Sequence, residues 1–486
     1  MSTESTLAVL LEDGDRDDIV AYANATPTTR DALQTLAREI ATALLRAECS
    51  GRAVGVLSPN EPETIAAWFG VWGASAAFVP LNPRAPAAEL ARAVQATGVQ
   101  AVIAWPDLAD RVPHEEMISI AKGPFALLRL HAAESRSVPA GEAIIQFTSG
   151  TTGAPKAVPL RHDTVSELLD TVIRSLRGSR PGKRARMPNL VPMSLSLWAG
   201  IYQVLFAFKL GVPVVLMPRF EAREFARLVR EYGITSSVLP PAALLILMQE
   251  PGVATLEPLR YVRCVSAPLS PAHARKFHER FGIAILNGYG QTELGGEAVG
   301  WSADDWKRYG LEKVGSVGRP HAAFRLRVRS EDGSLAAADE IGELEIASES
   351  ALPDDAAIEE RVTADGWLRT GDLARIDGDG FVWIEGRVSA MINRGGLKVF
   401  PDEVEERLRS HPTVLDVAVT GIADDRLGEV PWAFVVPSSG STVDTEQLRA
   451  WCRDALAPYK VPAGFTTVDN LPRNETGKVL RQELKV

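Results

Sequence analysis

Cysteine is scarce in this chain, and its few cysteines lie far apart. Cys49, Cys264 and Cys452 are the 3 cysteines among 486 residues, and they form no CxxC pair and no Cys/His cluster. A disulfide framework and a structural zinc site both need clustered ligands, so neither is expected. Isolated thiols fit a reducing compartment, and we expect a cytoplasmic protein.

Long hydrophobic runs and an excess of basic residues are also missing. The most apolar stretch, residues 65–81, contains two glycines and Pro80 and is too short and broken to span a bilayer. The N-terminal residues lack the basic region of a signal peptide. Asp and Glu outnumber Lys and Arg by 62 to 52, a formal net charge of −10. We therefore expect neither a membrane nor a nucleic acid as partner.

The rest of the composition is that of an ordinary globular protein. Hydrophobic residues make up 46% and charged residues 23% of the chain, which excludes a disordered, collagen-like or coiled-coil protein. The length of 486 residues exceeds the usual size of one domain, so two or more domains are expected.

Helical and strand-like segments alternate along much of the chain. Each segment with apolar residues at helical spacing lies beside a short apolar run. The helical segments are 31–47, 64–73, 87–97, 220–232 and 271–281, and the apolar runs are 53–59, 76–79, 100–105, 234–239 and 284–286. This alternation predicts parallel strands with covering helices.

The pattern changes in the last third of the chain. From about residue 314, short alternating runs separated by Asp-Gly turns predict a β-rich segment. The last part is expected to form helices at 401–410 and 445–456 and strands at 414–420 and 431–436. We therefore expect an α/β protein with a large N-terminal domain, 1–388, that combines mixed parallel β-sheets, helices and a β-rich subdomain. A small α+β C-terminal domain, 389–486, follows it.

A loop with the composition of a phosphate-binding site follows the apolar strand 143–146. The string FTSGTTGAPK, residues 147–156, combines hydroxyls, glycines and a lysine. Glycine lets backbone N–H groups approach a phosphate, hydroxyls donate to it, and lysine adds a positive charge. The string is not a Walker A motif, because it contains no GK[ST]. Taken alone, such a string also fits a surface loop.

The complete string resembles the phosphate loop of the adenylate-forming (AMP-binding) superfamily, which contains acyl-CoA ligases, adenylation domains and luciferases. The other signatures follow in the order of that family to the C-terminus, and the chain is most similar to the acyl-CoA ligases. The resemblance implies ATP, Mg²⁺ and CoA as cofactors. It also assigns pyrophosphate binding to Thr148, Ser149, Gly150, Thr151, Thr152, Gly153 and Lys156.

The segment NGYGQTE, residues 287–293, is similar to the adenylate-binding segment of this family. By this resemblance Tyr289 stacks on adenine, Thr292 contacts the nucleotide phosphate, and Glu293 holds Mg²⁺. An aromatic face suits a purine, and a carboxylate beside a triphosphate needs an intervening cation. Alone, Gly-Tyr-Gly also fits a tight turn. The resemblance adds these residues to the nucleotide site: Asn287, Gly288, Gly290, Gln291, Ser266, Ala267 and Pro268.

Three further motifs match the family. Asp372, in WLRTGD, is the expected ribose anchor, because one carboxylate can accept hydrogen bonds from both ribose hydroxyls. Arg387, by resemblance, reaches the ribose and phosphate. Without the other motifs, these two residues also fit a turn cap and a surface charge. Lys478, in PRNETGK, resembles the catalytic lysine that bridges the substrate carboxylate and the α-phosphate.

The family likeness also implies a mobile C-terminal domain. In this family the small domain swings after adenylation, withdraws the lysine and presents a second face for attack by a thiol. Residues 392–401 are similar to that face, and Gly395 and Gly396 would line a narrow pantetheine tunnel. Ala390 stands at the pivot where the family normally has Asp or Lys, so a hydrogen bond that favours one orientation would be missing.

The acyl pocket is expected around Leu195, Trp198, Gly200 and Leu294. Many acyl-CoA ligases have a histidine where Leu195 stands, which leaves the acceptor step open. Residues 181–220 contain no Asp or Glu to hold an α-ammonium, and an unpaired buried ammonium is costly. An apolar or aromatic acid is therefore favoured over an α-amino acid. Trp198 fits core packing equally well.

These motifs together predict an AMP-forming acid–thiol ligase. It would activate a carboxylic acid with ATP to an acyl-adenylate and then form a thioester with CoA, as a monomer or homodimer. One alternative keeps adenylation but transfers the acyl group to a carrier protein, an amine or a small inorganic nucleophile. A second, a nucleotide-binding relic, is disfavoured because Lys478, Glu293 and Asp372 are all present.

Overall fold

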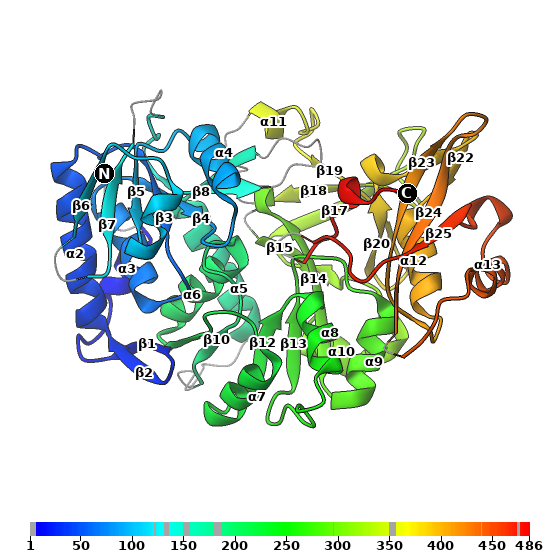
Figure 1. Ribbon diagram of the computed structural model, residues 1–486, viewed down its shortest axis with the longest axis horizontal. Helices are drawn as coiled ribbons and strands as arrows, with labels where there is room; N and C mark the ends of the chain where they lie inside the picture. The colour runs from blue at the N-terminus through cyan, green and yellow to red at the C-terminus, as the bar shows by residue number, and fades with distance from the viewer. Residues whose placement is uncertain are drawn as a thin grey trace.

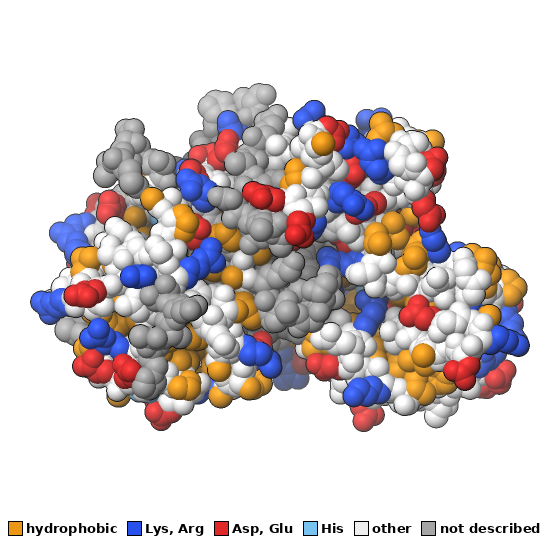
Figure 2. All heavy atoms as spheres, turned by 90° about the horizontal axis from the view of Figure 1, so that it is seen from above, with side chains coloured by type: hydrophobic (Ala, Val, Ile, Leu, Met, Phe, Trp, Pro, Cys, Tyr) orange, Lys and Arg blue, Asp and Glu red, His pale blue; other side chains and the backbone are white. Residues whose placement is uncertain are grey.

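The fold is given by a computed structural model of the chain, whose elements are labelled in Figure 1. The structure describes residues 6–120, 123–130, 136–148, 156–177, 187–294, 296–348, 356–438, 440–473 and 477–486. Within these residues, no helix is both long and apolar enough to cross a membrane. Acidic and basic side chains alternate over the face shown in Figure 2, and no continuous basic patch forms there.

A seven-stranded sheet forms the first part of the fold, with strand order β6-β7-β5-β3-β4-β8-β9. β3, β4, β5 and β8 are parallel where they pair, as the alternating pattern predicted. The strands are β3 (Ala53–Leu57), β4 (Ala77–Leu81), β5 (Ala101–Ala104), β6 (Glu116–Ser119), β7 (Ala126–Arg129), β8 (Glu142–Thr148) and β9 (Lys156–Arg161). The neighbouring helices are α1 (Val9–Glu12), α2 (Arg30–Arg46), α3 (Pro62–Gly73), α4 (Ala87–Thr97) and α5 (His162–Arg177).

Both faces of this sheet are buried. Val54 and Val56 of β3 belong to the core that includes α2 and α3, whereas Ala53 and Leu57 belong to the core on the α4 side. Successive strand residues point to opposite faces, so a strand covered on both sides reads as a continuous apolar run. The predicted helices at 31–47, 64–73 and 87–97 are confirmed.

A five-stranded sheet carries much of the expected nucleotide site, with order β12-β13-β14-β15-β16. The first three strands are parallel and the last two antiparallel. The strands are β12 (Ser236–Leu239), β13 (Tyr261–Cys264), β14 (Ala284–Gln291), β15 (Gly296–Gly300) and β16 (Arg319–Pro320); the helices beside them are α7 (Ala222–Glu231), α8 (Pro241–Gln249), α9 (Pro271–Phe281) and α10 (Ala303–Tyr309). β14 extends beyond the predicted run 284–286, so the NGYGQ segment lies in a strand and not in a tight turn.

A small four-stranded sheet, β10-β11-β1-β2, was not predicted. Its strands are β1 (Ile19–Ala23), β2 (Thr26–Thr29), β10 (Asn189–Val191) and β11 (Val214–Leu216), and α6 (Trp198–Leu210) lies between the last two in sequence. β2 reads TPTT and gives no strand signal, whereas β1 reads IVAYA and β11 reads VVL, apolar runs that were not recognised as strands.

The predicted β-rich segment is an antiparallel sheet with order β17-β18-β19-β20. Its strands are β17 (Phe324–Arg329), β18 (Gly342–Ser348), β19 (Leu368–Ile376) and β20 (Val382–Arg387), and α11 (Ala356–Glu359) precedes β19. Glycines 333, 366 and 380 of the Asp-Gly pairs have φ of 85°, 84° and 81°, as turns of this kind require.

The C-terminal part has its own sheet, in the order β22-β21-β24-β23 with β25 beside β24. Its elements are β21 (Ile392–Arg394), β22 (Leu397–Val399), α12 (Pro401–Arg409), β23 (Val414–Asp424), β24 (Gly428–Pro437), α13 (Thr445–Arg453) and β25 (Gly464–Thr467). Figure 1 shows these elements gathered at one end of the molecule. The α/β class with a small α+β C-terminal part is confirmed, and the proposed boundary at Val388 falls between β20 and β21.

Candidate active site

Asp372 of β19 is the centre of the candidate site. Its side chain is buried, and its two oxygens have different partners. Oδ2 accepts hydrogen bonds from the Tyr289 hydroxyl at 2.6 Å and from Nε2 of Gln291 at 2.8 Å. Oδ1 pairs with Nε of Arg387 at 2.8 Å, and the two residues are neighbours in the register of β19 and β20. The sheet β17–β20 thus meets β14 at this carboxylate.

Tyr289 is held as a hydrogen-bond donor. Burial and the adjacent Asp372 carboxylate raise the pKa of the Tyr289 hydroxyl well above its ordinary value. The hydroxyl therefore keeps its proton at neutral pH. Because each carboxylate oxygen can accept two hydrogen bonds, Oδ1 of Asp372 retains a lone pair beside Arg387.

Lys478 lies in the electrostatic field of the same site. Burial lowers its pKa, the charges of Arg387 and Arg481 lower it further, and those of Asp372 and Asp402 oppose this shift. Figure 1 shows the red C-terminal segment that contains it running back toward β14 and β19. The structure therefore places Lys478 within electrostatic range of Asp372 and Arg387, although 106 and 91 residues separate them in the sequence.

The chain on either side of Lys478 is fastened at several points. Arg473 and Val479 form an antiparallel bridge, and Arg473 also pairs with Asp416 of β23. Gly477 has a φ of 82°, and a Cβ added there would lie 3.2 Å from Cβ of Ala242 in α8. The lysine is therefore presented from the C-terminal sheet against the N-terminal part.

Glu293, the expected Mg²⁺ ligand, follows β14 in the short helix Thr292–Leu294. Its Oε1 pairs with Arg361 at 2.8 Å, and Arg361 also donates to Oε1 of Gln291 at 3.0 Å. Sequence reasoning did not identify Arg361, which lies in none of the motifs. In the described residues, no group of three or more His, Cys, Asp or Glu could hold a metal. Mg²⁺ in nucleotide enzymes needs only one or two carboxylates plus phosphates, so Glu293 fits this role.

The expected phosphate loop lies mostly outside the described residues. Thr148 ends β8, Lys156 begins β9, and the two are paired in the antiparallel register. The intervening Ser149, Gly150, Thr151, Thr152 and Gly153 are outside the described residues, as are the side chains of Thr148, Lys156 and Thr292. The described part of this region is therefore the antiparallel pair of β8 and β9 up to Thr148 and Lys156.

The segment after β13 has a strained backbone. Ser266 has a φ of 78°, which is uncommon for a residue other than glycine, and Ala267 and Pro268 follow it. Such strain persists only where the surroundings hold it, and it is frequent at ligand sites.

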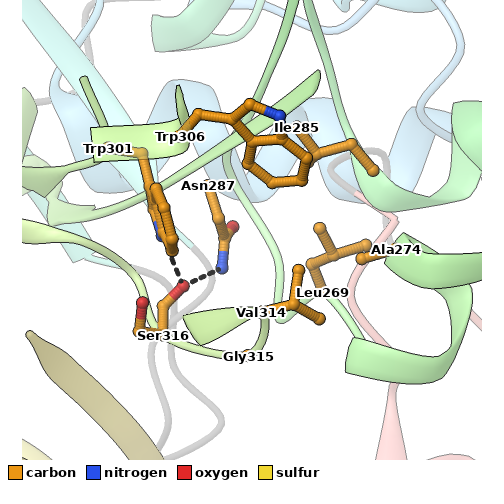
Figure 3. A pocket seen from close by; sticks show the side chains of 9 residues that line it. All are labelled: Leu269, Ala274, Ile285, Asn287, Trp301, Trp306, Val314, Gly315 and Ser316. Atoms are coloured by element: carbon orange, nitrogen blue, oxygen red, sulfur yellow. Dashed lines mark hydrogen bonds between the residues drawn. The ribbon is translucent and has the colours of Figure 1, made fainter. Parts of the chain in front are cut away.

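Asn287 points into the interior. It is buried, and its amide donates to the carbonyl of Ser316 at 3.2 Å, as does the Trp301 indole at 3.1 Å (Figure 3). The cavity between these side chains and Leu269 has a volume of about 10 Å³, enough for about one water molecule. The Asn287 side chain therefore fastens β14 to the segment before β16.

Part of the expected acyl region is packed core. Leu195 is buried, and its N–H donates to Asn60 at 2.8 Å. Gly200 lies against the Ser194 carbonyl, which leaves no room for a Cβ, and Leu294 is buried against the β-rich sheet. Trp198 is partly buried and meets the Tyr202 ring edge-on, with 5.9 Å between ring centroids.

Family models match most of the chain. The model of the AMP-binding enzyme family covers residues 13–353, and that of the AMP-binding enzyme C-terminal domain covers residues 403–478. The chain belongs to the AMP-binding enzyme family. The resemblance to adenylate-forming enzymes noted in the motifs is thereby confirmed.

Individual relatives agree with this family. The chain is 32% identical to the sulfoacetate–CoA ligase of Cupriavidus necator, over 93% of this chain and 90% of the relative. It is also 32% identical to the feruloyl-CoA synthase of Amycolatopsis sp, over 90% and 88%. The structure of the amide bond synthetase McbA from Marinactinospora thermotolerans matches with a TM-score of 0.83 and 28% identity, over 98% of both chains.

The second predicted face of this AMP-binding enzyme lies elsewhere. Gly395 and Gly396 form the turn between β21 and β22, with φ of 60° and 89°. Beside this turn, Lys398 pairs with Glu331 of the β17–β18 turn at 2.5 Å. Gly477 beside Lys478 and Lys398 beside the Gly395–Gly396 turn therefore face different parts of the N-terminal region.

A contact between α12 and α9 holds this arrangement. Oε1 of Glu406 accepts the N–H of Ala272 at 3.0 Å, and Oε2 accepts the Ser270 hydroxyl at 2.6 Å. Ser270 is the N-cap of α9, where N–H groups have no partner inside the helix and a negative charge is favourable. Nearby, Nε2 of His273 donates to the Leu415 carbonyl at 3.2 Å. We call the contact of Glu406 with the α9 N-terminus the α12–α9 latch.

Proposed function

We propose that this chain activates an apolar or aromatic carboxylic acid with ATP and transfers the acyl group to CoA, using the site around Asp372 and Lys478. The chain is an AMP-forming acid–thiol ligase, as its membership of the AMP-binding enzyme family and its acyl-CoA ligase relatives indicate. The observation that carries the assignment of the site is the convergence of Lys478, Asp372 and Arg387, residues that local sequence does not bring together.

In the first step a carboxylate oxygen of the acid attacks the α-phosphorus of ATP. The bond from this phosphorus to the bridging oxygen breaks, and pyrophosphate leaves. Lys478 lies between the two anions and offsets the charge that accumulates as they meet. Asp372 and Arg387 hold the ribose, which fixes the α-phosphate relative to the lysine. Mg²⁺, held by Glu293, would neutralise phosphate charge.

In the second step the thiolate of CoA attacks the acyl carbon and AMP leaves. We propose that the C-terminal part then rotates about the segment near Ala390, so that Gly395 and Gly396 face the acyl-adenylate. Their missing side chains leave room for the pantetheine arm. We assign the α12–α9 latch to the first orientation, since it forms while Lys478 lies within electrostatic range of Asp372.

A second candidate is transfer of the acyl group to an amine. The McbA match supports it, because that structure is named an amide bond synthetase and covers 98% of this chain. The leucine at position 195, where many acyl-CoA ligases have histidine, is consistent with a different acceptor step.

The proposal is tested with purified protein, ATP, Mg²⁺ and a panel of acids. Pyrophosphate release measures activation, and the product formed with CoA or with simple amines identifies the acceptor. We expect acyl-CoA and AMP. Acid-dependent pyrophosphate release that yields amides but no thioester would favour the amine acceptor, and an absence of release with every acid would contradict activation.

Lys478→Ala separates the two steps. We expect adenylate formation to fall by about 10² to 10³-fold, as for removal of other transition-state donors, while supplied acyl-adenylate still reacts with CoA. Lys485→Ala, which removes an exposed lysine near the C-terminus, is the control. An equal loss of both steps would show that Lys478 has another role.

The compartment and partners are proposed on simpler grounds. Cys49, Cys264 and Cys452 are buried free thiols, which fits a reducing cytoplasm. A small carboxylic acid and CoA, or another acceptor, are the proposed partners, and the enzyme is proposed to act as a monomer or homodimer.

A further inference from the structure

Glu297 of β15 folds its carboxylate back across a pair of glycines. Gly288 of β14 and Gly300 of β15 face each other in the strand register. A Cβ added at Gly288 would lie 2.6 Å from Cδ and Oε2 of Glu297, and one added at Gly300 would overlap Oε1. Glycine weakens a strand interior, so glycines there mark places where another group approaches the backbone closely. The Glu297 carboxylate therefore occupies space that a side chain at position 288 or 300 would fill.

The two oxygens of Glu297 have different surroundings. Oε1 accepts hydrogen bonds from Arg263 and from Nε2 of His321, the latter at 2.9 Å. Arg263 is further fixed by donating to the Trp301 carbonyl at 3.1 Å. Among the groups that the structure describes, none donates to Oε2. The protein thus holds the carboxylate by one oxygen and leaves the lone pairs of the other available to a donor.

The position of this carboxylate links it to the candidate active site. Gly288, over which Oε2 lies, directly precedes Tyr289, whose hydroxyl donates to Asp372. Arg263 is the penultimate residue of β13, and the strained segment at Ser266 follows. In α/β sheets, ligands bind beyond the carboxyl ends of parallel strands, and β13 and β14 are parallel. Glu297 therefore lies at the ligand-binding edge of the sheet.

Tyr202 of helix α6 senses the charge of the same group. Burial and the negative charge of Glu297 raise the pKa of the Tyr202 hydroxyl, and the positive charge of Arg263 opposes this shift. Tyr202 is thus within electrostatic range of the Arg263–Glu297 pair, and its ring packs edge-on against Trp198. Trp198 is a predicted acyl-pocket residue, so the carboxylate borders the expected acyl region from the side of β15.

We propose that Oε2 of Glu297 binds a hydrogen-bond donor on the acyl group, and that the substrate is therefore an aromatic acid with a hydroxyl or N–H substituent. This inference rests on the proposed function, because it concerns the acyl group activated there. The rings of Trp198 and Tyr202 provide the aromatic surface. A donor is favoured over an anion because Oε2 of the ionised Glu297 can accept a hydrogen bond but has no proton to donate to a second carboxylate or a sulfonate, whereas Arg263 and His321 already donate to Oε1.

A panel of benzoic and cinnamic acids tests the inference with the wild-type protein. Hydroxy and amino derivatives at the 3- and 4-positions are compared with their methyl and methoxy counterparts, and with derivatives that carry a second carboxylate or a sulfonate. The readout is kcat/KM for pyrophosphate release. We expect the best donor-bearing acid to exceed its methyl counterpart by about tenfold to hundredfold, the range of a hydrogen bond to a charged group.

The variant Glu297→Gln removes the charge at nearly constant size. We expect the ratio of kcat/KM between the donor-bearing acid and its methyl counterpart to fall toward one. Glu250→Gln is the matched control, because Glu250 is also partly buried and pairs with an arginine, Arg223, at 2.8 Å. The control should keep the wild-type ratio, and thermal unfolding of both variants is measured alongside.

Three results would overturn the inference. They are activation without a preference for donors, a preference for dicarboxylic or sulfonated acids, and an equal loss for all acids in Glu297→Gln. If that variant is insoluble, the wild-type panel decides alone. If no acid of any class releases pyrophosphate, the proposed function fails instead, so the two failures are distinguishable.

Discussion

Lys478 is a partly buried cation among charges of both signs. Burial, Arg387 and Arg481 lower its pKa below the ordinary lysine value. A lysine with a lowered pKa loses its proton at a lower pH than usual, so its ability to offset phosphate charge should disappear early as pH rises. The position of one side chain thus sets the alkaline limit of the proposed adenylation step.

This gives a prediction for the pH profile. The value of kcat/KM for ATP in pyrophosphate release reports groups of the free enzyme, and we expect it to fall with rising pH at a pKa below the ordinary 10.4 or so of lysine. Lys478→Arg keeps its charge over the accessible range, so its alkaline limb should move to higher pH even if its rate is lower. An unchanged limb in this variant would assign the titration to another group.

Arg361 shows that a residue outside every motif can contact the site. Its guanidinium pairs with Glu293, the proposed Mg²⁺ ligand, and a cation on that carboxylate competes with the metal. We expect Arg361→Met to lower the Mg²⁺ concentration for half-maximal pyrophosphate release by up to about fivefold, the worth of a partly exposed ion pair. Arg325→Met is the control. A higher Mg²⁺ requirement would mean that Arg361 itself binds the phosphates.

At the scale of elements, helix α3 approaches α2 at a glycine. A Cβ added at Gly70 would lie 2.7 Å from Cβ of Ile40 and 2.9 Å from the Ala37 carbonyl. Ile40 is fully buried, so the two helices cannot yield without repacking. The close contact of α2 and α3 therefore depends on the absence of one methyl group.

Two alanine substitutions in α3 test this contact. Both gain helix propensity, but Gly70→Ala should lose about 1–3 kcal/mol of stability through overpacking. At Gly73, the nearest atom to an added Cβ is Cβ of Ala41 at 3.2 Å, so Gly73→Ala should have a much smaller effect. Urea unfolding measures both. Equal stability of the two variants would show that α2 moves aside freely.

Most elements could be predicted from local pattern. The helices α2, α3, α4, α7 and α9 follow from apolar residues at helical spacing, which is a property of short segments. The strands β10 and β11 have only three residues each and β2 is polar, so they give no period, whereas β1 is an apolar run of five residues that was not recognised as a strand. The extension of β14 to Gln291 was missed because its glycines resemble a turn, whereas pairing with β15 keeps the segment extended.

At the scale of the whole molecule, the α12–α9 latch joins the C-terminal part to the N-terminal part. The Glu406 carboxylate satisfies N-terminal groups of α9 only while α12 lies against that helix. Burial and the charge of Arg409 lower the pKa of the neighbouring His273 to about 4. The His273 ring is therefore neutral at neutral pH. The orientation that presents Lys478 is thus favoured by a contact far from it in sequence.

We expect Glu406→Gln to weaken this orientation. Pyrophosphate release should slow by up to about tenfold, the worth of a charge-assisted hydrogen bond, while thioester formation from supplied acyl-adenylate should not slow. Glu403→Gln on the same helix, which removes an ion pair with Lys460 inside the C-terminal part, is the control. Equal slowing of both half-reactions would mean that Glu406 only stabilises the fold.

The sequence by itself determined the class of fold and the order of the motifs. It also singled out Asp372, Arg387 and Lys478 as candidate site residues. These are local properties, because periodicity, turn chemistry and motif strings each lie within a few neighbouring residues. The chain has few cysteines, no excess of basic residues and no long apolar run. These absences excluded several classes of protein without any structure.

Only the tertiary structure decided which residues from distant segments meet. Arg361 contacts Glu293 across 68 positions, and Glu406 reaches Ser270 across 136. Residues 181–220 contain no acid, and only the fold lays the Glu297 carboxylate of β15 against Gly288 and Gly300. Such contacts depend on how sheets and helices pack, and no local pattern records packing between segments that are far apart in the chain.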